Sequence, residues 1–100
     1  MINRMYTIYD SAAEVYMRPF MLQADGQAIR AFTDLVNNPQ EPIGQHPEDY
    51  TLLFCGLFDD QAGRFIDDGA DVLPQSLGNG LAFKRGEKAL EGPAQLTGVN

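Results

Sequence analysis

The segment from His46 to Gly63 reads HPEDYTLLFCGLFDDQAG and places a loop, an apolar strand and a turn in succession. Residues 50–58 are almost continuously apolar, which is typical of a strand at the centre of a sheet. Residues 59–63 predict a hairpin connection, because Gly63 can supply the positive φ that a type I turn with a bulge requires. Residues 64–66 are therefore expected to return antiparallel to the central strand.

Two further strands are expected before this segment. Residues 5–9 alternate β-forming side chains and are too few for a stable helix. Residues 15–22 have a β-like pattern, with Val15, Met17 and Met21 on one side and Tyr16, Arg18, Phe20 and Leu22 on the other. Pro19 lacks the N–H that a strand ladder requires, so this second strand is predicted to lie at an edge or to bend there.

One helix is predicted over residues 25–37. The Asp25 side chain is expected to accept hydrogen bonds from the free amides of the first turn. An apolar stripe with a 3.6-residue period follows, made of Ala28, Ile29, Phe32, Leu35 and Val36. Pro39 disfavours helical backbone in the preceding residue and ends the helix. Residues 39–47 contain three prolines and a glycine and are predicted to form a surface loop.

The elements together predict an α+β fold in the order β-β-α-β-β, a small antiparallel sheet covered on one face by one amphipathic helix. Residues 70–73 are expected to pair weakly, and residues 81–83 to add a short strand or a helical turn. Residues 1–83 are predicted to be a single domain. Residues 84–100 lack an apolar face to bury and are predicted to be a flexible C-terminal tail.

Composition limits the classes of function. The chain has 7 basic and 14 acidic residues, so its formal charge of −7 opposes strong non-specific binding to DNA. The single cysteine excludes an internal disulfide and a multi-cysteine zinc site, as expected in a reducing compartment. No apolar run approaches the roughly 20 residues of a membrane helix, and no membrane association is predicted.

The residues of catalytic and metal chemistry do not assemble into a known pattern. His46 is the only histidine, and nothing in the sequence brings a nucleophile such as Cys55 to it. Cys55 is expected to be a small buried side chain. Five carboxylates near the hairpin lack the spacing of a calcium loop and are predicted to form a solvated rim: Asp59, Asp60, Asp67, Asp68 and Asp71. We expect no enzyme, no cofactor and no metal.

Two alternative binding surfaces are predicted. His46, Glu48 and Asp49 lie in a proline-flanked loop and are candidates for contact with a protein partner. Aromatic and basic side chains of the first two strands are candidates for stacking on single-stranded DNA. These are Arg4, Tyr6, Tyr9, Tyr16, Arg18 and Phe20. A homo-oligomer formed through the strand that contains Pro19 is a further possibility.

Three stretches carry a family resemblance: MYTIYDS at residues 5–11, AIRAFTDLVN at 28–37 and HPEDYTLLFCGLFDD at 46–60. They resemble the small non-structural protein of gokushoviruses, the single-stranded DNA phages of the Microviridae, over residues 5–83. The resemblance implies a non-enzymatic role in the host bacterial cytoplasm, in the switch to single-strand DNA synthesis and packaging. It implies the replication initiator, the procapsid or a host replication protein as partner, and it carries over no catalytic residues.

Overall fold

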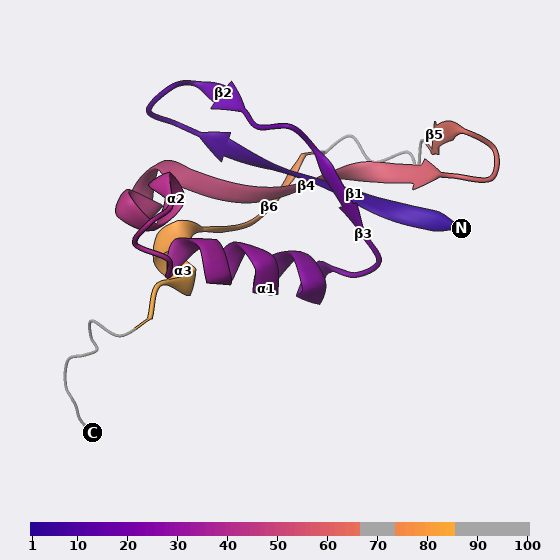
Figure 1. The fold of residues 1–100 in the computed structure, drawn as a ribbon. Helices are drawn as coiled ribbons and strands as arrows, with labels where there is room; N and C mark the ends of the chain where they lie inside the picture. Colours follow the sequence, from indigo (N-terminus) through magenta and orange to yellow (C-terminus); the bar gives the residue numbers. More distant parts are fainter. Residues whose placement is uncertain (67–73, 86–100) are drawn as a thin grey trace.

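The computed structural model describes residues 1–66 and 74–85. Strands β1 (Ile2–Asp10), β2 (Val15–Tyr16) and β3 (Phe20–Leu22) precede helix α1 (Asp25–Val36). The short helix α2 (Pro42–Gln45) and the 3-10 helix η1 (Pro47–Asp49) come next. Strands β4 (Tyr50–Asp59), β5 (Arg64–Ile66) and β6 (Gln75–Asn79) then lead into helix α3 (Gly80–Phe83), as Figure 1 shows. The fold is α+β, as predicted.

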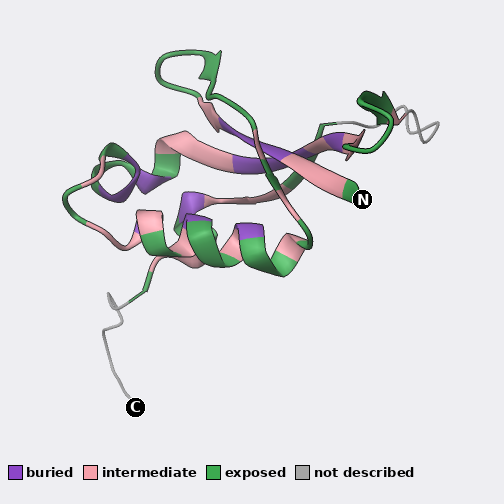
Figure 2. Cartoon of the chain, turned by 45° about the vertical axis from the view of Figure 1, so that its right-hand side comes forward, coloured by how far each residue is buried: buried purple, intermediate pink, exposed green. Residues whose placement is uncertain are grey.

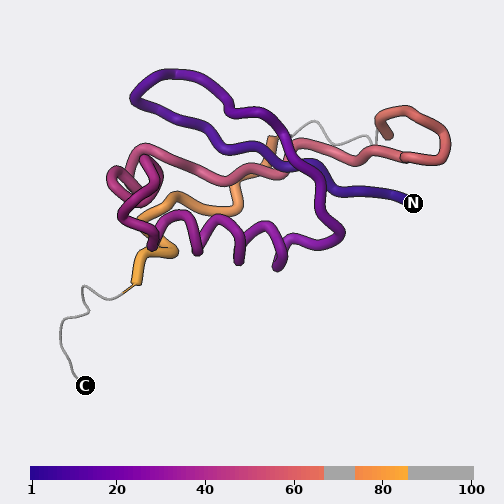
Figure 3. Tube along the Cα trace, viewed as in Figure 1, coloured from indigo at the N-terminus to yellow at the C-terminus, as the bar shows by residue number. Residues whose placement is uncertain are grey.

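The long strands β1 and β4 form the centre of an antiparallel sheet of six strands. Their register runs from Ile2 opposite Asp59 to Asp10 opposite Tyr50, with a bulge between Met5 and Tyr6. Strands β2 and β3 both pair with β1, and β5 and β6 both pair with β4. Figure 3 shows the N-terminal strand lying beside residues 50–59 although the two are far apart in sequence. The predicted central position of residues 50–58 is confirmed.

The hydrophobic core lies between the sheet and α1. It contains side chains from β1, α1, α2 and β4, namely Tyr6, Ile8, Ala28, Phe32, Val36, Ile43, Leu52 and Phe54. The buried positions of α1 face the sheet in Figure 2, and Ile29 and Leu35 pack at the margin of the core. The predicted apolar stripe is therefore the face that α1 buries, as its 3.6-residue period indicates.

The predicted second strand is divided into two short strands. Pro19 lies in the gap between β2 and β3, where the chain remains attached to β1 through a hydrogen bond from the Met17 N–H to the Ile8 carbonyl (2.8 Å). The Thr7 hydroxyl also donates to the Met17 carbonyl (2.7 Å). The predicted edge position is confirmed, because both strands pair only with β1, and the strand is interrupted at Pro19.

The predicted surface loop at residues 39–47 is the main correction. It contains α2, and η1 follows directly, with Ile43, Gly44 and Pro47 all buried. Gly44 lies against the C-terminal end of α1, and Pro47 lies against Gly80 of α3. Proline at the start of α2 and of η1 favours helical turns, so the segment is not an open loop.

The hairpin at residues 59–63 is confirmed. Gly63 has a φ of +69°, and its N–H donates to the Asp59 carbonyl (2.8 Å). The Asp59 side chain accepts from the N–H groups of Gln61 and Ala62 (3.0 and 3.2 Å), which fixes the turn.

The end of the domain was only partly predicted. Strand β6 was not predicted, whereas residues 81–83 belong to a helical turn, α3. The expected pairing of residues 70–73 and the carboxylates Asp67, Asp68 and Asp71 lie outside the described residues. Of the predicted tail, Lys84 and Arg85 are described, and the Arg85 N–H donates to Asn37 Oδ1 (2.7 Å). No helix within residues 1–66 and 74–85 is long and apolar enough to cross a bilayer.

Candidate functional site

The predicted partner-contact residues His46, Glu48 and Asp49 lie together on the surface around η1. Their possible ligand atoms are all within 4.8 Å of one another. His46 and Glu48 are exposed and Asp49 is partly exposed, so all three side chains are accessible to a second molecule. We call these three residues the acidic loop.

Backbone hydrogen bonds hold the acidic loop in a defined shape. The His46 N–H donates to the Pro42 carbonyl and the Asp49 N–H to the His46 carbonyl, both at 3.0 Å. The Asp49 carbonyl accepts from the Ser11 N–H (2.8 Å) and the Ser11 hydroxyl (3.1 Å), which ties the loop to the end of β1. The carboxylates are therefore presented from rigid backbone, which lowers the entropy lost when a partner binds.

The chemistry of the acidic loop suits cationic groups. Two carboxylates beside an imidazole can accept hydrogen bonds from lysine or arginine side chains of a partner. The same donor types occur in divalent-cation sites. No second feature of residues 1–66 and 74–85 marks the loop as a metal centre. Because its carboxylates are accessible and accept hydrogen bonds from cationic groups, the loop is a candidate surface for a basic protein partner.

The six residues predicted to stack on single-stranded DNA do not share one surface. Tyr6 is fully buried, and its ring packs against those of Phe20 and Phe54, with centroid distances of 5.7 and 5.8 Å. Tyr6 therefore has no exposed face on which a base can stack. Arg4 lies over the Phe54 ring, 4.1 Å from its centroid, and Nε of Arg4 donates to Asp25 Oδ1 (2.9 Å).

The other aromatic pair lies elsewhere. The rings of Tyr9 and Tyr16 are 4.6 Å apart between centroids, and Tyr16 is 58% exposed. Arg18 is exposed and lines an apolar pocket of about 320 Å³ together with Ile8, Met17, Phe20, Ala31, Phe32 and Leu35. The sequence pattern missed this pocket, because its lining comes from the β2–β3 connection, β1 and α1, which are brought together only by the fold.

Asp25 has a different role from the helix cap predicted for it. Ala24 precedes the first turn of α1, and the Gln27 side chain accepts from the N–H groups of Gln23 and Ala24 (2.9 and 3.2 Å). The Asp25 carboxylate instead accepts from the Tyr6 hydroxyl (2.7 Å) and from Arg4. These contacts lower the pKa of Asp25, the Tyr6 hydrogen bond being the largest cause. Burial, more than any other cause, raises the pKa of Tyr6.

The dependence of the protein's stability on pH tests the contact of the Asp25 carboxylate with Tyr6 and Arg4. A carboxyl whose pKa is lower in the folded than in the unfolded chain stabilises the fold above its unfolded pKa of about 3.9, and the stabilisation is lost as the pH falls through the folded value. The stability advantage of the wild type over Asp25→Asn should therefore be largest above about pH 5 and shrink toward about pH 2. Urea unfolding at several pH values measures it.

Tyr6→Phe is the matched variant for this experiment. It keeps the buried ring and removes the hydroxyl that donates to Asp25. Its stability should depend less steeply on pH than that of the wild type in the same acidic range. An unchanged acid profile in both variants would contradict the assigned hydrogen bond.

Cys55 is partly buried on β4. Burial raises the pKa of its thiol, so the thiol remains protonated at neutral pH and is a poor nucleophile. This agrees with the prediction of a small packed side chain, apart from its partial exposure.

Comparison with known proteins identifies the family. A family profile described as "Phage ORF5 protein" matches residues 3–83, from β1 to the end of α3. The chain belongs to the phage ORF5 protein family. It is similar to Protein ORF5 of Chlamydia phage 1, with 32% identity over 72 residues that cover 68% of this chain and 75% of that protein. No solved structure matches.

Membership of the ORF5 family confirms the resemblance to gokushovirus proteins. It makes the chain a phage accessory protein. The matched residues include β1, α1 and the acidic loop, which are the segments that carried the resemblance in the sequence.

Proposed function

We propose that this ORF5-family protein acts without catalysis in replication of the phage genome, in the switch to single-strand DNA synthesis and packaging, by binding a protein partner in the host cytoplasm. The observation that carries the proposal is the acidic loop, in which accessible carboxylates are held on rigid backbone. The partner is the phage replication initiator, the procapsid or a host replication protein.

The charge of the chain supports this class of partner. Proteins that handle DNA have basic patches, and an acidic surface attracts such patches and directs their encounter. A chain with a formal charge of −7 has little capacity to neutralise phosphates itself. Binding that depends on the acidic loop should weaken as salt screens the charges.

Reversing the acidic loop's charge tests the proposal. Glu48→Lys combined with Asp49→Lys should lower the affinity for the purified phage replication initiator by about tenfold or more, because two attractive contacts become repulsive. The initiator is tested first, and the procapsid and host replication proteins are tested in the same way. Titration calorimetry and co-purification at low and physiological salt measure the effect.

The matched control is Glu14→Lys combined with Asp34→Lys, which reverses two exposed acidic residues that do not belong to the loop. Both double variants have the same net charge. The control should retain at least most of the affinity. Equal loss in both variants would show a general charge effect, and full binding by the loop variant to every partner tested would exclude the acidic loop as the contact.

A further inference from the structure

The apolar pocket of about 320 Å³ lies between the β2–β3 connection and α1. Two side chains of the hydrophobic core, Ile8 of β1 and Phe32 of α1, are buried and form its floor. Met17, Phe20 and Leu35 complete its apolar lining, and Met17 is 42% exposed. The pocket is therefore continuous with the core and accessible from solvent.

The walls of the pocket are fixed by the fold. Ala31 and Leu35 lie one turn apart on α1, and because Ala31 contributes only a methyl group, the space beside it is not filled. On the other wall, the Met17 N–H donates to the Ile8 carbonyl (2.8 Å), and the Thr7 hydroxyl donates to the Met17 carbonyl (2.7 Å). Walls that are in place before binding lower the entropy that a ligand loses.

Water is a poor occupant of this pocket. A bound water needs at least two polar partners, and every lining side chain except that of Arg18 is apolar. An apolar molecule that displaces weakly held water gains affinity. A cavity of about 150 Å³ with a similar lining accepts a benzene ring. The volume of about 320 Å³ therefore has room for about twice as many carbon atoms.

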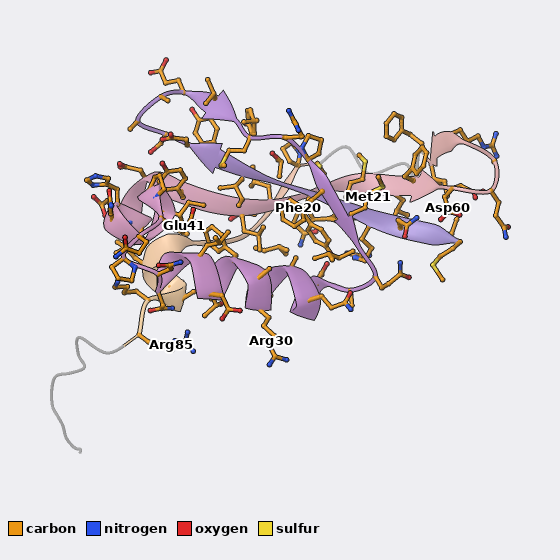
Figure 4. The ribbon with its side chains drawn as sticks, in the orientation of Figure 1. Phe20, Met21, Arg30, Glu41, Asp60 and Arg85 are labelled. Carbon is orange, nitrogen blue, oxygen red and sulfur yellow. The ribbon has the colours of Figure 1, made fainter. Side chains whose placement is uncertain are left out.

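Arg18 gives the pocket a single positive charge. It is exposed and is the one charged residue of the lining. Within the part of the chain that the structure describes, Arg18 forms no ion pair, whereas Arg4 is bonded to Asp25. Arg30 points away from the sheet in Figure 4, so it does not serve the pocket. A guanidinium binds a carboxylate through two parallel hydrogen bonds, and Arg18 is available for such a group.

We propose that this pocket binds a small amphipathic carboxylate of the medium-chain fatty acid class. The alkyl chain contacts Phe20, Phe32 and Leu35, and the carboxylate binds Arg18. The chain has a formal charge of −7 and does not attract anions in general, so the local charge of Arg18 accounts for the choice of headgroup. No residue of the acidic loop lines the pocket, and the proposal does not depend on the proposed function.

The walls suit an alkyl chain better than a peptide. A buried peptide needs hydrogen-bond partners for its own N–H and carbonyl groups. The N–H and carbonyl of Met17 are already bonded, Pro19 has no N–H, and the amides of α1 are bonded within the helix. An alkyl chain requires no such partners.

Titration of the full chain with decanoate tests the proposal. We expect saturable binding with a dissociation constant below about 1 mM, measured by calorimetry. In two-dimensional amide NMR spectra, the largest shifts should occur at Met17, Arg18, Ala31 and Leu35. Decanol and decyltrimethylammonium have the same alkyl chain and should bind about tenfold more weakly or less, because they lack the contact between charges.

Two variants test the two parts of the site separately. Arg18→Gln should weaken decanoate binding by about tenfold and leave decanol binding unchanged, because it removes only the charge. Ala31→Phe should weaken the binding of both ligands by about tenfold or more, because a ring at this position fills the pocket. Ala31 is exposed, so the core is not altered, and circular dichroism confirms that both variants are folded.

Arg30→Gln is the matched control, because it removes the same charge from a residue of α1 that points away from the sheet. It should retain the affinity for decanoate. The proposal would be overturned by a wild type that does not bind decanoate up to about 1 mM, or by decanoate binding that persists in both pocket variants. Equal loss in Arg18→Gln and Arg30→Gln would also overturn it, as would tighter binding of decyltrimethylammonium. Tighter binding of an apolar tripeptide with a free carboxylate would replace the fatty acid by a peptide ligand.

Discussion

Replacing Leu52 by alanine is expected to lower the free energy of unfolding by about 3 kcal/mol, within the range of 2–5 kcal/mol seen for buried leucines. Leu52 is fully buried on β4, opposite Ile8 in the central strand pair. Truncation removes apolar contacts and leaves a cavity between the sheet and α1. For a domain of this size, whose total stability is of the order of 5–15 kcal/mol, this is a large fraction.

Leu81→Ala is the control for the same chemical change. Leu81 is 60% exposed, and its truncation should alter the stability by less than about 0.5 kcal/mol. Urea unfolding followed by circular dichroism measures both variants. If the two substitutions had equal effects, the assignment of Leu52 to the core would be wrong.

Gly44→Ala is expected to destabilise the protein, whereas Gly26→Ala is expected to stabilise it. A Cβ at Gly44 would collide with the backbone carbonyl oxygen of Asn38 and would lie 2.6 Å from its carbonyl carbon. Backbone atoms cannot rotate away as a side chain can, so α2 must shift from α1, at a cost of about 1–3 kcal/mol. A Cβ at Gly26 meets nothing within 4 Å. Alanine there should gain about 0.5–1 kcal/mol through its higher helix propensity.

The Gly44→Ala substitution also tests the link between α2 and the acidic loop. His46 follows α2 directly, and its N–H is bonded to the Pro42 carbonyl, so a shift of α2 displaces the loop. We expect weaker binding to the partner proposed for the acidic loop in a variant that remains folded. Unchanged stability would contradict the close approach of Gly44 to Asn38.

The elements that the sequence predicted correctly depend on local patterns. Each of these patterns is contained in a segment of about a dozen residues. They are the 3.6-residue apolar period of α1, the apolar run of β4 and the glycine of the β4–β5 turn. The acidic loop was also predictable as a cluster, because His46, Glu48 and Asp49 are neighbours in the chain and one helical turn gathers them.

The features that the sequence missed depend on distant contacts. Strand β6 has little alternation, and the Asn79 side chain holds its end by donating to the Glu48 carbonyl and the Thr51 hydroxyl. The pattern of β1 does not reveal which face meets α1, so Tyr6 looked as accessible as Tyr9. The Tyr6 hydroxyl donates to Asp25, 19 positions further along the chain, and this contact places Tyr6 on the side of the sheet that faces α1.

The pairing of β1 with β4 has a consequence for the order of folding during synthesis. Paired residues are separated by between 40 positions (Asp10 and Tyr50) and 57 positions (Ile2 and Asp59). The centre of the sheet therefore cannot assemble on the ribosome until residue 59 has emerged. Until then β1 has only the short strands β2 and β3 as partners, which together cannot complete a core. Closing so long a loop is slow, so the rate of folding should be set by this single encounter.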